Sequence, residues 1–510
     1  MCKVGCRLPR LCLSIEVVLR NTRVLRTRLP VSLILLTARP TGFNKMFGTS
    51  RELSLISRPR GKQRLKRQTN NALLLHEPRD KNFLLFNHYF SLVCPISSLF
   101  DSGQNPFRSY VSEMMASSRL LFLCVMNMSA SDFRKNDGSS IAPLSFQTEA
   151  ISEISEEPCK ITNPTIVTFD KPNNGPSIIL STSLYPVEDE VLLGIILLGI
   201  TSSWYDPSSL DLSHIDGSRL LFQSWAKDQG LDCPSESRIM TRIQAFLVPS
   251  MVYCEVLSLA YLDTFLENAV FPSSFVCPWT GVETSVFSCL GRIGSPIRRK
   301  RSLVRTTLQD ESGISQGMAY MNSLNEASLW ENQMHRGQLP KLSSIEDTGD
   351  IKALLIHFRQ LAHCYQLGGC LEPYCAFPEL ARARLESDPA ARLPCDGIDK
   401  QSQLLLGIAL DILNTLETIP DDCRTIATWT LVLIIAGSVL GKIKAVDERQ
   451  FMSEQYTFNR NIERWGKFVL QSLSRIYQII GLRTIQRAIT LLVEVRSHID
   501  FGTAPGDQTE

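Results

Sequence analysis

The chain has 510 residues, of which 44% are hydrophobic and 20% are charged. This balance excludes a chain that is disordered over most of its length and is typical of one large or two to three ordinary globular domains. The formal net charge of +2 excludes a strong overall field that would attract nucleic acid.

Residues 1–81 are expected to form a basic, disordered arm. The first 75 residues contain sixteen Lys or Arg residues and two acidic residues, whereas the remaining 435 residues have a net charge of −12. This distribution suits an N-terminus that meets a polyanion and a body that meets other proteins. The Arg-rich stretch 11–36 also resembles a mitochondrial transit peptide, which is an alternative interpretation of the arm.

One run inside the arm is a candidate nuclear localisation signal or phosphate contact. Residues 58–67 read RPRGKQRLKR and contain six basic residues and no acidic residue. The six basic residues are Arg58, Arg60, Lys62, Arg64, Lys66 and Arg67. A solvated charged linker is the alternative. A second run, Arg298–Arg301, is a weaker candidate for the same role.

From Asn82 onward, apolar residues recur at helical spacing, which predicts an all-α body over residues 82–500. The pattern is strongest over 351–365, 405–419 and 465–480. The longest apolar run, Ile426–Leu440, has fifteen residues, fewer than the ~20 that cross a bilayer, so we expect a buried helix and no membrane partner. Stretches rich in Ser, Pro, Asn and Gly predict mobile insertions near 131–185 and 298–350, and residues 501–510 are expected to be a tail.

The chain lacks the sequence signatures of common enzymes. It contains no GxxxxGK[ST] loop, GxSxG elbow, HExxH helix or GxGxxG turn, and none of its seven histidines lies in a recognisable acid–base pair. We therefore expect no catalytic residue. Three tryptophans, Trp279, Trp429 and Trp465, are expected in the core.

Five blocks, in order along the chain, resemble the fungal-specific transcription factor domain of zinc-cluster regulators. They are 82–130, 191–222, 258–301, 362–380 and 419–440, followed by 483–496. The residues that carry the resemblance include His88, Tyr89, Phe100, Asp101, Asn105, Pro106 and Phe107, then His214, Asp216, Gly217 and Ser218, then Pro278, Trp279, Thr280 and Gly281. The resemblance implies a helical regulatory domain that controls RNA polymerase II genes of a metabolic or secondary-metabolite pathway in the nucleus.

The same resemblance implies partners and a cofactor. Expected partners are DNA, the transcription machinery or other regulators, and a second copy of the chain, and an effector pocket is expected between the helices. Members of the family carry zinc on six cysteines, but here Cys2, Cys6 and Cys12 have the spacing C-x3-C-x5-C and the next cysteine is Cys94. Three thiolates cannot hold the two metal ions, so we expect no working zinc site and no evident cofactor. The alternatives are a cofactor or truncated paralogue that does not bind DNA, and a helical biosynthetic enzyme.

Most of the fifteen cysteines lie in apolar runs, and their number is odd. They are expected to be reduced, buried thiols of a nuclear or cytosolic protein. A metal on the cluster His363, Cys364, Cys370 and Cys375 is not expected, because its spacing fits no common zinc pattern and a helix would bury it.

Overall fold

The computed structural model describes residues 81–137, 143–156, 167–169, 177–179, 187–205, 212–231, 240–258, 275–306, 313–388, 399–443 and 454–500. The N-terminal arm up to residue 80 and the tail 501–510 lie outside the described residues. From Asn82 onward the described residues belong to one compact unit.

The predicted all-α class is confirmed. The first half contains α2 (Lys81–His88), a π-helical turn (Tyr89–Val93), α3 (Cys94–Ile96), α4 (Tyr110–Ser117), α5 (Arg119–Asp137), α6 (Pro143–Glu156), α7 (Asp189–Tyr205), α8 (Leu212–Asp228) and α9 (Arg242–Ser258). The second half contains α10 (Thr284–Thr306), α11 (Gly313–Arg336), α12 (Leu355–Ala376), α13 (Pro378–Ser387), α14 (Lys400–Glu417), α15 (Thr430–Ile443), α16 (Glu454–Ile480) and α17 (Arg483–Asp500), with 3₁₀ turns at Leu342–Ser344 and Arg424–Thr428. Strands β1 (Val167–Phe169) and β2 (Ser177–Ile179) form one antiparallel hairpin that pairs Val167 with Ile179.

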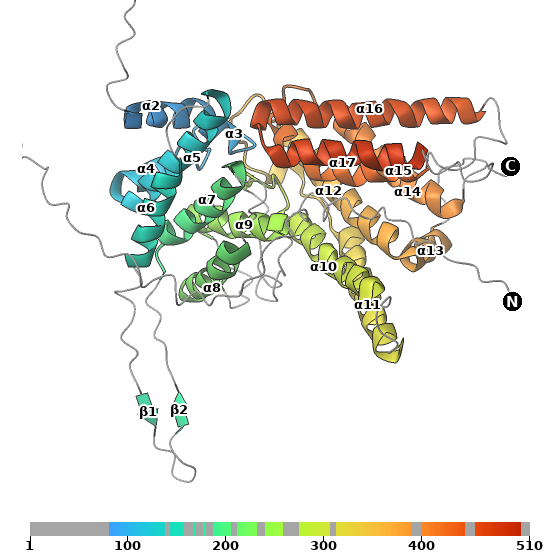
Figure 1. Ribbon diagram of the computed structural model, residues 1–510, viewed down its shortest axis with the longest axis horizontal. Helices are drawn as coiled ribbons and strands as arrows, with labels where there is room; N and C mark the ends of the chain where they lie inside the picture. The colour runs from blue at the N-terminus through green and yellow to red at the C-terminus, as the bar shows by residue number, and fades with distance from the viewer. Residues whose placement is uncertain are drawn as a thin grey trace, which may run out of the picture. The chain divides into compact units, whose positions relative to one another are not determined.

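The described helices pack as two neighbouring groups (Figure 1). In the first group α5 packs on α4, α6 and α7, and α7 packs on α8 and α9. In the second group α14, α16 and α17 pack around α15, and α12 packs on both α14 and α15. Helix α10 contacts α9 on one side and α12 on the other, so it joins the two groups.

The predicted tryptophan core is confirmed, with Trp279, Trp429 and Trp465 exposing 7%, 1% and 3% of their surface. The apolar run 426–440 forms the end of the 3₁₀ turn Arg424–Thr428 and most of α15, and it is largely buried as predicted. Helices α15 and α16 approach closely at Gly437, where an added Cβ would lie 3.0 Å from a methyl group of Val469. Among the described helices, none combines the length and the apolar character that crossing a bilayer requires.

The interpretation of residues 131–185 as a loop was wrong where α5 and α6 cover them. Helix α5 continues to Asp137, and α6 begins at Pro143, a residue favoured in the first turn of a helix. Phe146, Ala150 and Ile154 of α6 are four residues apart and pack into the core. Because many residues on the exposed face of α6 are polar, the sequence pattern did not reveal this short apolar stripe.

The predicted mobile insertion near 298–350 was wrong where α10 and α11 cover it. Helix α10 extends to Thr306, and α11 occupies Gly313–Arg336. Ser323, Ala327, Glu331 and Met334 form its buried face, and only two of these four side chains are apolar. A helix whose buried face is half polar gives a weak hydrophobic period in the sequence.

The helix predicted to begin near Ile351 begins instead at Leu355. Ile351 is 88% exposed, and the backbone N–H of Ala353 donates to the carbonyl of Asp350 in a turn that precedes α12. The backbone N–H of Arg424 donates to the Lys352 carbonyl at 3.0 Å, which holds this turn in a non-helical path. A partner more than seventy residues away therefore overrides the local period.

A tight turn before α10 depends on one glycine. The N–H groups of Cys277 and Gly281 each donate to the other residue's carbonyl, at 2.8 and 3.0 Å, which closes the turn around Pro278 and Trp279. Gly281 has a φ of +77°, and an added Cβ would lie 3.3 Å from Cδ1 of Phe358. Residues with a side chain rarely adopt this backbone conformation.

We predict that Gly281→Ala lowers the free energy of unfolding by about 1–2 kcal/mol, because the left-handed backbone strains an L-residue. The control is Gly317→Ala on α11, where no heavy atom lies within 4 Å of the added Cβ. That change is expected to stabilise the protein by about 0.5–1 kcal/mol. Urea titrations of both variants measure the difference, and equal midpoints for the two would contradict the prediction.

Candidate functional site

The segment between α3 and α4 is built by residues that the resemblance had singled out. Asn105 is fully buried, and its side chain accepts a hydrogen bond from the N–H of Phe107 and donates to the Cys94 carbonyl. Tyr89 donates its hydroxyl hydrogen to the Phe107 carbonyl at 3.2 Å. These bonds fix the path of the backbone from Cys94 to Phe107, which includes the segment 96–99 discussed below.

Four charged side chains of alternating sign hold that segment against distant parts of the chain. We call Asp101, Arg108, Asp350 and Arg424 the charge quartet. Arg424 Nε lies 2.7 Å from Asp350 Oδ2, and Arg424 Nη2 lies 3.5 Å from Asp101 Oδ2. Arg108 Nη2 donates to Asp101 Oδ2 at 3.0 Å. The Asp101 N–H also donates to Asp350 Oδ2 at 2.7 Å, so backbone and side chains close one network.

The charge quartet is largely shielded from water at its acidic centre. The side chains of Asp101 and Asp350 are 12% and 7% exposed, and those of Arg108 and Arg424 are about one third exposed. Burial alone would raise the pKa of Asp101, but the hydrogen bond and charge of Arg108, helped by Asn105 and Arg424, lower it below the ordinary value of 3.8. Asp101 is therefore held as a carboxylate at neutral pH.

A second set of bonds joins the segment 96–99 to the turn before α10. The Leu99 N–H donates to the Pro278 carbonyl, and Nε1 of Trp279 donates to the Ser97 carbonyl, both at 2.8 Å. Trp279 then lies against Phe107, Phe246 and Tyr253, with ring centres 5.3–5.9 Å apart. These contacts make one wall of a cavity.

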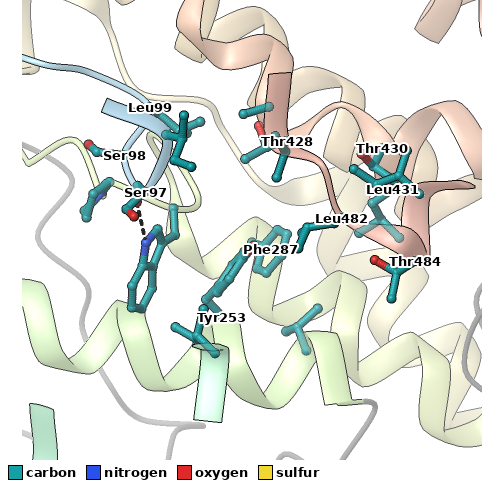
Figure 2. Close-up of a pocket in the computed structure, with 18 of the residues that line it drawn as sticks. Ser97, Ser98, Leu99, Tyr253, Phe287, Thr428, Thr430, Leu431, Leu482 and Thr484 are labelled. Atoms are coloured by element: carbon teal, nitrogen blue, oxygen red, sulfur yellow. Dashed lines mark hydrogen bonds between the residues drawn. The ribbon is translucent and has the colours of Figure 1, made fainter. Parts of the chain in front are cut away.

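The cavity lies where the two groups of helices meet α10 and has a volume of about 280 Å³. Its walls come from the segment 96–99, from α7, α9 and α10, from the start of α15, and from the connection between α16 and α17. Figure 2 shows Ser97 to Leu99 on one side, Thr428, Thr430, Leu482 and Thr484 on the other, and Tyr253 and Phe287 between them. We call it the central cavity.

The lining of the central cavity is apolar and uncharged. Among the described residues, the lining contains aromatic and aliphatic side chains, a few hydroxyl groups and no Asp, Glu, Lys, Arg or His. Burial raises the pKa of both Tyr253 and Tyr365, so their phenols stay protonated at neutral pH. The cavity thus offers shape, apolar surface and hydrogen bonds, but none of the usual groups for acid–base catalysis at neutral pH.

The described cysteines do not fit a zinc cluster. They are free thiols in separate parts of the helical core, and burial raises the pKa of those at 94, 370 and 254 to about 12. A thiolate is the species that binds metal, so such thiols are poor ligands. Within the described residues no three His, Cys, Asp or Glu side chains come together as a metal site. Cys2, Cys6 and Cys12 lie outside those residues.

The structure describes only the second of the two basic runs. Arg58, Arg60, Lys62, Arg64, Lys66 and Arg67 all lie outside the described residues. The run Arg298–Arg301 lies on α10, where Arg299 pairs with Glu326 of α11 and Lys300 donates to the Ala376 carbonyl. Lys300 also lies 4.7 Å from the ring centre of Phe377. These residues stabilise the packing of α10 against its neighbours.

Comparison with known families gives one match. The family described as "Fungal specific transcription factor domain" matches residues 83–497. Curated proteins and solved structures gave no match. The match spans most of the chain and includes every segment that contributes to the central cavity and the charge quartet. The chain belongs to the fungal specific transcription factor domain family and is a fungal transcriptional regulator.

The sequence had indicated Asp101 and Asn105 but not the residues that complete the site. Arg424 and Asp350 meet Asp101 from positions 323 and 249 residues away, and nothing in their local patterns marks them as its partners. The local sequence around the lining residues Tyr253, Leu482 and Thr484 likewise predicts only ordinary core positions. Asp350 stands beside other acidic residues in SSIEDTGD, and Arg424 follows two aspartates in PDDCR, so local sequence gives no signal for their pairing with Asp101.

We predict that Asp101→Asn removes about 2 kcal/mol of stability at pH 7, because Arg108 loses a charged hydrogen-bond acceptor and Arg424 loses an ion-pair partner. Since the pKa of Asp101 is lowered by folding, its contribution is complete above the ordinary value of 3.8 and is lost as pH falls through the folded value. The difference between variant and wild type should therefore shrink below about pH 4 in urea unfolding.

The control for this prediction is Asp388→Asn, which removes a partly exposed partner of Arg384. An exposed pair of this kind contributes less than about 1 kcal/mol. A cost of Asp101→Asn that stays constant from pH 7 to pH 3 would show that its charge is not what stabilises the quartet.

Proposed function

We propose that this protein regulates RNA polymerase II genes of a metabolic or secondary-metabolite pathway from the nucleus. The observation that carries the proposal is the family match over residues 83–497, which covers the whole described helical body. In this proposal the body contacts the transcription machinery or other regulators, and a second copy of the chain is a candidate partner. The basic arm supplies nuclear import or contact with DNA phosphate.

We propose that the central cavity is the effector site of this regulator. Its walls come from both groups of helices and from α10 between them, so a bound molecule touches all three. A ligand shifts a conformational equilibrium only by its differential affinity for the two states. A site that spans packed groups is where such a difference arises, because relative movement of the groups changes its shape.

A second candidate is a regulator that does not itself bind DNA and acts through other proteins. The observation that favours it is that Cys2, Cys6 and Cys12 are the only cysteines before the helical body, where the family's cluster uses six. In that case the basic arm would serve import alone.

We predict that changing all six basic residues of the run 58–67 to Ala moves the full-length fluorescent fusion from nucleus to cytoplasm. The reason is that nuclear import signals are recognised by their clustered positive charges. The matched control changes Arg20, Arg23, Arg26 and Arg28 to Ala, which removes charge from the same arm but leaves the run intact. Nuclear retention of the six-alanine variant would contradict the assignment, and a mitochondrial wild-type fusion would contradict nuclear function altogether.

Transcript profiles of a deletion strain test the regulatory role directly. Loss of the gene should change a limited set of messenger RNAs that encode enzymes of one pathway, and the wild-type chain should restore them. An unchanged profile under all growth conditions would count against the proposal.

Zinc content and gel shifts with the purified full-length chain separate the two candidates. For a direct DNA binder we expect sequence-selective binding that weakens steeply with salt, as phosphate contacts require. For the second candidate we expect weak binding without sequence preference and less than one zinc per chain. Sequence-selective DNA binding by a zinc-free chain would exclude the second candidate. It would also show that the selectivity does not come from a zinc cluster.

A further inference from the structure

The size of the central cavity limits what it can hold. Its volume is about 280 Å³, roughly twice that of a ~150 Å³ apolar cavity that binds benzene. A compound of about two rings fits this space. A sugar phosphate, a nucleotide or a peptide would be too large or too polar.

The charge of the lining limits the ligand further. No lining residue is ionised at neutral pH, and the charge quartet beside the cavity contains two acids and two arginines whose charges cancel. A charged ligand would lose its hydration without gaining a counter-ion. The occupant is therefore uncharged.

The aromatic rings of the wall favour a ring compound. Tyr253 stacks on Phe287 with ring centres 6.0 Å apart, and Phe287 meets Tyr365 edge-on at 5.1 Å. Trp279 lies 5.3 Å from Tyr253 and completes the row. Because these rings already fix one another, they present a preformed apolar surface against which another ring can pack.

One hydroxyl group at the wall is enclosed without a partner. Oγ of Ser97 is buried and makes no hydrogen bond within the described part of the chain. In contrast, Thr428 donates to the Thr425 carbonyl, and Nε1 of Trp279 donates to the Ser97 carbonyl. Buried polar groups in proteins are normally paired, so the unpaired Ser97 hydroxyl indicates a ligand that carries oxygen. Tyr253 lines the same cavity and carries a second hydroxyl group that can bond to this oxygen.

We infer that the central cavity binds an uncharged, mainly apolar compound of about two rings that bears a hydroxyl or carbonyl oxygen. This inference rests on the effector role proposed above and names the ligand class for that site. Ser97 and Tyr253 bond the oxygen, and the aromatic row packs against the rings.

Three matched probes test the ligand class on the purified full-length chain by equilibrium dialysis at pH 7. They are 2-naphthol, which is neutral and carries a hydroxyl, naphthalene, which has no oxygen, and 2-naphthoate, which is an anion. We expect 2-naphthol to bind most tightly and 2-naphthoate to bind at least about 10-fold more weakly, because its carboxylate is desolvated without a partner. Equal or tighter binding of 2-naphthoate, or no binding of 2-naphthol, would overturn the inference.

Removal of one hydroxyl tests the hydrogen bond. Tyr253→Phe should weaken the binding of 2-naphthol by about 3- to 10-fold, the range expected for one neutral hydrogen bond. The affinity for naphthalene should stay unchanged. The control is Tyr477→Phe on α16, which packs against the core but does not line the cavity. An equal loss for both probes would mean that the hydroxyl does not contact the ligand.

Filling the cavity tests its location. Leu482→Trp places a larger side chain from the α16–α17 connection into the space, and Ile200→Trp does so from α7. Both should abolish 2-naphthol binding while circular dichroism shows retained helix, whereas Leu220→Trp on the exposed face of α8 should not. If both filled variants fold and still bind 2-naphthol, the site lies elsewhere.

These measurements are independent of transcription. Binding with the expected probe order but unchanged transcripts in a deletion strain would refute the regulatory function and keep the cavity as a ligand site. A regulated transcript set without any probe binding would refute the ligand class and keep the regulator.

Discussion

The contact of Arg424 with both Asp101 and Asp350 is the interaction on which the arrangement of this site depends. It brings together three segments that are far apart in the sequence, and each segment leads directly into a cavity wall or the helix behind it. Residues 96–99 precede Asp101, residues 427–431 follow Arg424, and Asp350 precedes α12, which carries Tyr365. Taking charges out of water is costly, so an ion pair of this kind persists only where it is well matched. Here two acids face two arginines, and backbone N–H groups complete the network, so neither carboxylate is left alone.

The cavity exists because the same segments are held from two sides. The charge quartet fixes Asp101, while Trp279 and Pro278 fix Ser97 and Leu99 through backbone carbonyls and N–H groups. Protein interiors normally close around empty space, because the lining loses dispersion contacts with every gap. A rigid frame of ion pairs and a closed turn prevents that collapse. Stability and ligand capacity are therefore linked at this point of the fold, where the rings of Tyr253, Phe287 and Tyr365 also pack against one another.

How much of this could be predicted from the sequence depends on the range of the interactions. The helical class and the buried tryptophans follow from local sequence and were predicted. Helix α6 was missed because only Phe146, Ala150 and Ile154 face the core, and α11 was missed because Ser323 and Glu331 share its buried face. The start of α12 was misplaced because a bond from Arg424 overrides the local period. The resemblance implied a pocket between the helices, but the place and lining of the central cavity could not be predicted, since a cavity is a property of many converging segments and leaves no mark on any one of them.

Because the lining of the cavity is uncharged, the ways in which a bound ligand can affect the rest of the protein are limited. A charged effector could act at a distance through its field, but a neutral one acts only through the side chains that it touches. Those side chains lie on the segments 96–99 and 278–279, on α5, α7, α9, α10, α12 and α15, and on the connection that ends at α17. A tenfold difference in affinity between two arrangements of these helices corresponds to about 1.4 kcal/mol, which is also the size of one or two well-placed ring contacts. The wall segments on either side of Ser97 and Thr428 are tied to the charge quartet, so they resist displacement. No member of the charge quartet lies on α7 or on the α16–α17 connection, so the quartet does not hold these two walls.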